Sequence, residues 1–318
     1  MKIGFVGKGG SGKTTISSLL SRCLASQGFP MIAIDADINQ HLAQTIGLEK
    51  HEAENMKPMG LEINRIKEYL RGSNPFIADD NSMIKTTPPG NGSRFIKVIE
   101  ENPIYNYFSK TVQGIKVMAV GAFDESDLGV KCYHSKTGSV ELLLNHLIDK
   151  EKEYVIVDMT AGADSFASGL FTRFDITFLV VEPTIKSTSV YEQYKKYAKD
   201  YDVNIKVIGN KIENQEDINF IKKYVGKDLI AIIYQSQFVK KIDRGLSVAL
   251  SELELDNKAE IEKIIEIIDS QKKDWQKFYR QAVEFHIKNA ESWANTASGK
   301  DLTKQIDPNF NFLNAIST

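Results

Sequence analysis

The sequence predicts an α/β fold, in which a mostly parallel β-sheet carries helices on both faces and a C-terminal helical extension follows. Short apolar runs recur from residue 2 to residue 234, and helical patterns separate most of them. The runs are nearly continuous in apolar residues, as is typical of strands buried on both faces. Polar residues that suit ligand binding follow several runs, at the strand ends where parallel sheets bind their ligands.

Each expected strand is a short apolar run bounded by glycine or a polar residue. These runs cover residues 2–7, 31–34, 115–120, 154–157, 176–181, 205–208 and 229–234. Helical patterns lie between them, notably at residues 13–27, 138–150, 187–200 and 215–225. Because strands alternate with helices, we expect parallel strands joined by helical crossovers.

Two regions depart from this alternation. Residues 50–114 carry several prolines and glycines, with short helical pieces around 61–71 and 93–101, so we expect an insertion there. After about residue 258 a long helical pattern, amphipathic over 259–285, leads into a mostly polar tail. The expected division is therefore a first domain of residues 1–258 and a C-terminal helical extension of residues 259–318.

Charge and cysteine content narrow the class of protein. The chain has 40 Lys and Arg against 42 Asp and Glu, and this net charge of −2 gives no support to non-specific DNA coating. Two cysteines, Cys23 and Cys132, are too few for a disulfide framework. The first apolar run is too short for a signal peptide, and no stretch approaches 18 apolar residues. We therefore expect a soluble, cytoplasmic protein.

A glycine-rich loop is the strongest motif in the chain. Residues 7–14, GKGGSGKT, fit G-x-x-x-x-G-K-[ST] directly after an expected strand and before an expected helix. Glycines let backbone N–H groups curl around phosphate oxygens, and the helix N-terminus adds partial positive charge. A glycine-rich turn without a ligand is the alternative, but eight positions and their context agree with a phosphate loop. The residues expected to bind ATP or ADP here are Gly9, Gly10, Ser11, Gly12, Lys13, Thr14 and Thr15, with Thr14 also ligating Mg²⁺.

A second lysine distinguishes this loop from the common pattern. Lys8 gives the form K-G-G-S-G-K-T-T, which resembles the deviant phosphate loop of the partition, septum-positioning, nitrogenase iron protein and arsenite-pump ATPases. The resemblance implies a P-loop NTPase fold, ATP hydrolysis by Lys8 and Lys13, and an ATP-dependent homodimer. Lys8 would reach the partner's nucleotide, as an arginine finger does elsewhere. An exposed loop lysine without that role is the alternative.

Three aspartates stand at expected strand ends. Asp158, in V-I-V-D-M-T-A-G, occupies the place of a Walker B acid, which holds Mg²⁺ through water. Asp35 and Asp37 follow the second expected strand, where the resembled group has its first switch. The resemblance implies that Asp35 belongs to the magnesium shell and that Asp37 positions the attacking water. Loop aspartates that cap the next helix are the alternative.

Two further segments follow expected strands. Residues 160–162, T-A-G, look like the second switch, where a backbone N–H senses the γ-phosphate. Asn210 and Lys211 resemble the group's adenine-reading position, where an asparagine amide can both donate and accept. A turn asparagine is the alternative.

One short segment, Cys132-Tyr133-His134, indicates which branch of these ATPases the chain resembles. The runs L-G-V-K-C-Y-H-S-K-T-G-S-V-E-L-L-L and Y-V-I-V-D-M-T-A-G resemble the carbon-monoxide-dehydrogenase maturation ATPases, which assist nickel insertion. The similarity extends, with gaps, from residue 1 to about residue 255. That branch carries Cys-x-Cys here, and two subunits jointly hold one metal ion. His134 replaces the second cysteine, so Cys132 and His134 would offer a Zn²⁺ or Ni²⁺ site at the dimer interface. A solvent-facing pair without metal is the alternative.

The favoured function is a dimeric ATPase that couples nucleotide state to maturation of, or metal delivery to, a partner metalloenzyme. The alternative is a spatial-positioning or partition-type ATPase that acts on DNA, a membrane or a cargo protein. Binding to DNA is less expected, because the net charge is near neutral. Binding to a membrane is less expected, because acids and bases are interleaved along the helical stretch 259–285. An electron-transfer protein needs two cysteines per subunit for a [4Fe–4S] cluster, and only Cys132 is well placed.

Overall fold

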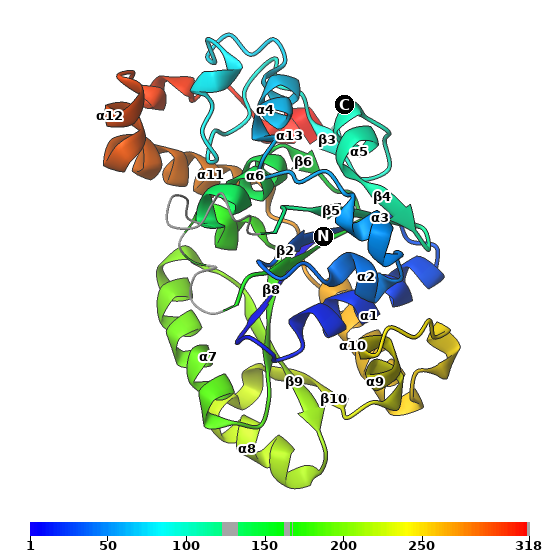
Figure 1. Cartoon of the computed structure of the whole chain (residues 1–318). Helices are drawn as coiled ribbons and strands as arrows, with labels where there is room; N and C mark the ends of the chain where they lie inside the picture. The colour runs from blue at the N-terminus through cyan, green and yellow to red at the C-terminus, as the bar shows by residue number, and fades with distance from the viewer. Residues whose placement is uncertain (123–132, 162–165, 167, 317–318) are drawn as a thin grey trace.

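The computed structural model describes residues 1–122, 133–161, 166 and 168–316, and of residues 133–135 it describes the backbone alone. Within this part of the chain, eight strands form one sheet in the order β10-β9-β8-β1-β7-β2-β5-β4 (Figure 1). All neighbouring strands are parallel except β4 and β5, which form an antiparallel hairpin. The strands are β1 (Lys2–Gly7), β2 (Met31–Ala36), β4 (Lys110–Val112), β5 (Ile115–Ala119), β7 (Tyr154–Met159), β8 (Ile176–Val181), β9 (Ile205–Ile212) and β10 (Leu229–Tyr234).

Helices cover both faces of this sheet. The helices of the α/β alternation are α1 (Lys13–Ser26), α2 (Leu42–Ile46), α6 (Tyr133–Asn145), α7 (Ile185–Ala198), α8 (Gln215–Val225), α9 (Gln237–Asp243) and α10 (Leu255–Asp269). Shorter elements occupy the expected insertion: α3 (Lys50–Glu54), α4 (Ile63–Arg71), β3 (Ile96–Lys97), which pairs with β6 (Leu147–Ile148), and α5 (Pro103–Phe108). The chain ends with α11 (Trp275–Asn289), α12 (Asn295–Ser298) and α13 (Phe312–Ile316). The predicted fold class is confirmed.

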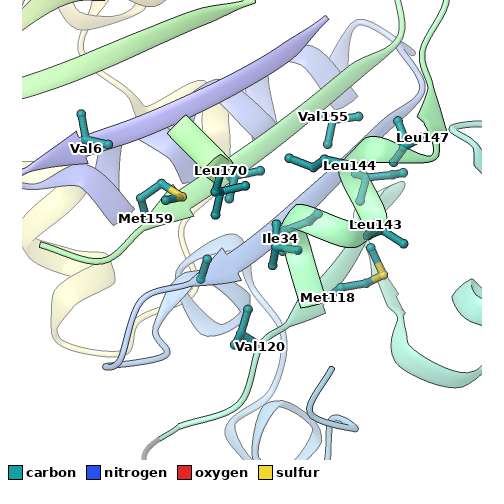
Figure 2. Close-up of a cluster of buried hydrophobic side chains, with 14 of the residues drawn as sticks. Val6, Ile34, Met118, Val120, Leu143, Leu144, Leu147, Val155, Met159 and Leu170 are labelled. Atoms are coloured by element: carbon teal, nitrogen blue, oxygen red, sulfur yellow. The ribbon is translucent and has the colours of Figure 1, made fainter. Parts of the chain in front are cut away.

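Alternate residues of the central strands enter two hydrophobic cores. Val155 and Val157 of β7 face one core, and Tyr154 and Ile156 face the other. Figure 2 shows part of the first core, where Leu143 and Leu144 of α6 pack near Ile34, Met118 and Val155. The second core lies between the sheet and helices α1 and α10. Burial on both faces explains why the strands read as continuous apolar runs.

Some predicted elements end elsewhere or are absent. Residues 93–101 are not helical; the helix begins at Pro103, because the Asn102 side chain caps its first N–H groups and proline suits the first helical position. The helix expected at 138–150 ends at Asn145, and β6 follows it. The amphipathic stretch 259–285 is two helices, separated where Asp274 caps α11 through its bond from the Lys277 N–H.

The expected boundary between residues 258 and 259 lies inside α10. The apolar face of α10 is buried in the second core, so this helix belongs to the sheet's covering layer. The last segment contacts the insertion: Gln305 accepts a hydrogen bond from Thr87, and Asp307 accepts one from the Asn91 N–H. Helix α11 contacts the first domain instead, where the Phe278 carbonyl accepts a hydrogen bond from Arg173. On packing, we therefore place the start of the extension after Asp269.

Across the described part of the chain, no helix combines the length and the apolar composition needed to cross a membrane.

Candidate nucleotide-binding site

The glycine loop connects β1, at the centre of the sheet, to α1 (Figure 1). Gly10 and Gly12 have φ values of 82° and 92°, in the left-handed region that favours glycine. A Cβ atom on Gly12 would lie 2.1 Å from the Asn210 side-chain nitrogen, and one on Gly7 would lie 2.5 Å from the Val180 carbonyl oxygen. The Val180 backbone therefore requires glycine at position 7, and the left-handed backbone favours glycine at position 12, where the Asn210 side chain also lies close.

Two side chains of the first turn of α1 contact the predicted acids. Lys13 is buried, and its Nζ lies 3.6 Å from Oδ2 of Asp37. Thr14 donates a hydrogen bond of 2.5 Å to Oδ2 of Asp158. The predicted phosphate lysine, magnesium threonine, Walker B acid and one switch acid are thus brought together at the carboxyl edge of the sheet.

Asp35 and Asp158 are register partners on adjacent strands β2 and β7. Burial raises the pKa of Asp158 to about 7, although the Thr14 hydrogen bond and the Lys13 ammonium favour its charged form. Burial and the Asp158 carboxylate together hold the pKa of Asp35 well above its usual range. Asp35 also accepts hydrogen bonds from the Asp37 N–H (3.2 Å) and the Leu42 N–H (2.8 Å), which order the loop after β2. The site is therefore a buried group of acids with too little positive charge around it.

Mg²⁺ fits this arrangement of donors. Asp158 Oδ1 and Ser11 Oγ are buried and have no hydrogen-bond partner within the described residues. A hard cation prefers carboxylate, hydroxyl and water oxygens, and Mg²⁺ is usually held by one or two carboxylates plus phosphate. Thr14 and Asp158 are the residues that would hold it, and its charge would offset the excess of carboxylates.

The raised pKa of Asp158 predicts how stability depends on pH. Unfolded aspartate titrates near 3.8, whereas folded Asp158 titrates near 7, so between these values the folded state binds more protons than the unfolded state. The stability of the unliganded protein should therefore fall as pH rises through this window. Asp158→Asn removes the free-energy cost of ionising a buried carboxyl group. The substitution should therefore stabilise the unliganded protein by on the order of 2 kcal/mol near pH 8, and by much less near pH 5.

Urea unfolding of both proteins with EDTA, near pH 5 and near pH 8, measures this difference. The control is Asp200→Asn, because Asp200 is exposed and its replacement should change stability little at either pH. Equal effects of Asp158→Asn at the two pH values would contradict a protonation penalty at this site.

The adenine-reading candidates contact the glycine loop itself. Asn210 is buried, and its Nδ2 donates to the Ser11 carbonyl oxygen at 2.8 Å. Lys211 has a left-handed backbone, with φ of 60°, and its Nζ donates to the Gly10 carbonyl oxygen at 2.7 Å. Both residues therefore border the loop, and in this structure they bind its carbonyl groups.

The remaining predicted residues have different outcomes. Lys8 and Gly9 are exposed in the loop, Thr15 lies in the first turn of α1, and Ala161, in the expected second switch, lies beside Gly9. Cys132 lies outside the described residues, and the side chain of His134 is not described. Among residues that are described, no group of three or more His, Cys, Asp and Glu side chains could hold a metal ion. The interface metal therefore stays a prediction.

One residue of the site was missed by the sequence analysis. Glu182 directly follows β8 and accepts a hydrogen bond from Lys211 Nζ. Its signal was present, because it is a carboxylate at the end of an expected strand, like Asp158.

A glycine loop between a buried strand and a helix, with a lysine, a threonine and strand-end carboxylates grouped beside it, defines a P-loop nucleotide-binding protein. The family model described as "CobQ/CobB/MinD/ParA nucleotide binding domain" matches residues 5–248 of the chain. The chain belongs to this family of P-loop ATPases.

Relatives and solved structures agree with that assignment. The carbon monoxide dehydrogenase accessory protein CooC of Rhodospirillum rubrum is 31% identical over 78% of this chain and 89% of its own length. An uncharacterized ATP-binding protein of Methanocaldococcus jannaschii is 30% identical over 84% of this chain and 97% of its own. The MinC:MinD cell division complex of Aquifex aeolicus has a TM-score of 0.54 at 20% identity, covering 86% of this chain and 97% of that chain. The cell division ATPase MinD of Pyrococcus furiosus also has a TM-score of 0.54, at 14% identity, covering 84% of this chain and 98% of that chain. At such identities the two structures show the fold alone.

Proposed function

We propose that the protein is a Mg²⁺-dependent ATPase that acts as an ATP-dependent homodimer and couples its nucleotide state to maturation of, or metal delivery to, a partner metalloenzyme. The observation that carries the nucleotide part is the grouping of Lys13, Thr14, Asp37 and Asp158 beside the glycine loop. The similarity to CooC supports the link to a metalloenzyme.

Each residue of this group has a role in the proposed hydrolysis. Lys13 and the loop N–H groups bind the β- and γ-phosphates. Thr14, together with Asp35 and Asp158 through water, would hold Mg²⁺, whose charge would neutralise the charge that develops on the phosphates. Asp37 orients a water molecule toward the γ-phosphorus. The water oxygen forms a bond to phosphorus as the bond to the β–γ bridging oxygen breaks. That oxygen leaves with ADP, and the protons of the water leave on inorganic phosphate or pass to solvent.

Exposed groups at the same edge of the sheet support the dimer. Lys8 is exposed and has no ion pair or side-chain hydrogen bond within the described part of the chain. Ile38 follows Asp37 and Ile185 begins α7, and their exposed fractions are 37% and 66%. A cation and two apolar side chains around the nucleotide site suit a second copy of the chain, which would cover them and receive Lys8.

Metal binding tests the maturation branch of this proposal. If Cys132 and His134 of two subunits hold one ion, neither subunit can complete a tetrahedral site alone, so metal binding and dimerisation must be linked. ATP should raise the affinity for Zn²⁺ or Ni²⁺, and the metal should raise ATP affinity by the same factor. Acidification should weaken metal binding, because thiolate and neutral imidazole must both lose protons.

Calorimetric titration of each metal into wild type and a Cys132→Ser/His134→Ala variant, with ADP or ATP, measures this linkage. One ion per two chains, lost in the double variant, supports metal delivery. Equal binding by the two proteins would contradict it. Nucleotide-dependent co-sedimentation with liposomes or DNA, without metal binding, would favour a positioning ATPase instead.

A further inference from the structure

Polar contacts connect three neighbouring strand ends at the nucleotide site. The sheet order places β8 between β9 and β1, so Glu182, after β8, lies between Lys211 of β9 and the loop after β1. Lys211 Nζ donates to Oε1 of Glu182 and to the Gly10 carbonyl oxygen. We call Glu182, Lys211 and the Gly10 carbonyl group the Glu182 latch.

Both charged members of the latch are held by local structure. The Glu182 N–H donates to Ser187 Oγ at 2.9 Å, and the Glu182 carbonyl accepts from the Thr184 N–H at 2.7 Å, so the turn before α7 fixes Glu182. Lys211 keeps a left-handed backbone although it is not glycine. Such a conformation costs free energy and persists where surrounding contacts determine it, typically at functional sites.

The latch and Asn210 each hold one carbonyl group of the loop. Asn210 and Lys211, neighbours on β9, bind the consecutive carbonyl groups of Ser11 and Gly10. In a trans peptide the C=O and the following N–H point in opposite directions. Holding these carbonyls toward β9 therefore turns the N–H groups of Ser11 and Gly12 away from β9, and the Ser11 N–H donates to the Lys8 carbonyl oxygen at 3.1 Å. A carbonyl released from this contact could turn its negative end toward the phosphates.

We propose that Glu182 is a positioning residue for nucleotide binding: it orients Lys211, which keeps the Gly10 carbonyl turned away from the phosphates. This inference rests on the nucleotide binding proposed above. The Glu182 and Lys211 side chains are 24% and 46% exposed, and such ion pairs contribute little to folding stability. The benefit of the latch is preorganisation, because a loop already in its binding conformation loses less entropy when the nucleotide arrives.

Glu182→Gln and Lys211→Met should each weaken binding of ADP and of ATP by about tenfold, because the loop must then be ordered during binding. The melting temperature of the unliganded protein should change little. The double variant should bind about as weakly as either single variant, since both changes break one contact chain. Lys211→Arg keeps the cation and its donors and should retain most of the affinity. Calorimetry with each nucleotide and thermal melts measure these quantities.

A matched control is available on the surface. Lys241 and Glu252 form an ion pair of 2.8 Å, in which the side chains are 47% and 49% exposed, and neither is hydrogen-bonded to the glycine loop or the latch among the described residues. Lys241→Met/Glu252→Gln should leave nucleotide affinity unchanged. If wild type binds nucleotide and the latch variants bind equally well, or lose only melting temperature, the positioning role is overturned. If wild type binds no nucleotide, the proposed function itself fails.

Discussion

Lys13→Ala should raise the dissociation constant for Mg·ATP by about 100-fold or more. The variant loses a buried ammonium whose charge-assisted hydrogen bonds to phosphate have no substitute in the loop. Calorimetric titration of Mg·ATP into wild type and variant measures the loss. Binding as tight as in wild type would overturn the assignment of the phosphate loop.

The stability of the Lys13→Ala variant should also depend on pH, and this dependence shows whether the variant is folded. Lys13 lies 3.6 Å from Asp37 and also lowers the pKa of Asp158. Without the ammonium, the pKa of folded Asp158 should rise further above its unfolded value. The folded variant then binds more protons than the unfolded variant up to a higher pH than in wild type, so its stability keeps falling as pH rises. The unliganded variant should therefore be nearly as stable as wild type near pH 5 and clearly less stable near pH 8. A folded variant near pH 5 that still fails to bind ATP separates loss of binding from loss of fold.

Most of the sheet was predictable because its strands are buried on both faces. Residues 176–181 and 229–234 are strands over the predicted range, and residues 215–225 form the predicted helix. Prediction failed where one side chain decides the boundary: Asn102 starts a helix at Pro103, and Asp274 divides the amphipathic stretch. Capping interactions of this kind are local and leave no hydrophobic periodicity.

The grouping of the candidate residues was predictable where chemistry fixes both residue type and spacing. The loop motif identifies Lys13 and Thr14, and strand-end positions identify Asp37 and Asp158, all of which meet in the structure. The sequence shows Glu182 as a strand-end carboxylate, but its contact with Lys211 depends on the strand order, which places β8 beside β9. The contacts of Asn210 with the loop likewise depend on two strands that are distant in sequence.

Lys8→Ala should lower turnover by about 1,000-fold while leaving ATP binding to a single subunit nearly unchanged. A cation that stabilises the transferring phosphoryl group from across an interface contributes on this scale. The Lys8 side chain is exposed and contacts no described residue through an ion pair or hydrogen bond, so its removal should not disturb its own subunit. ATP-dependent dimerisation should weaken as well, as measured by sedimentation velocity with ATP and with ADP.

Lys227→Ala is the matched control, because Lys227 is an exposed lysine that precedes β10, away from the carboxyl edge of the sheet. It should leave turnover and dimerisation as in wild type. A Lys8 variant that dimerises with ATP as well as wild type would argue against contact across subunits.

Mixing two inactive variants decides whether Lys8 acts on its own nucleotide or on the partner's. Asp37→Ala should bind ATP and lose turnover, because Asp37 orients water in its own subunit. If Lys8 acts across the dimer, a mixed dimer of Lys8→Ala and Asp37→Ala contains one complete site, formed by Asp37 of the first chain and Lys8 of the second. At protein concentrations high enough to keep every chain dimeric, equal mixing makes about half of the dimers mixed, each with one of its two sites intact, so about a quarter of wild-type activity should return. If Lys8 serves its own subunit, every site in the mixture lacks one group, and no activity returns at any ratio.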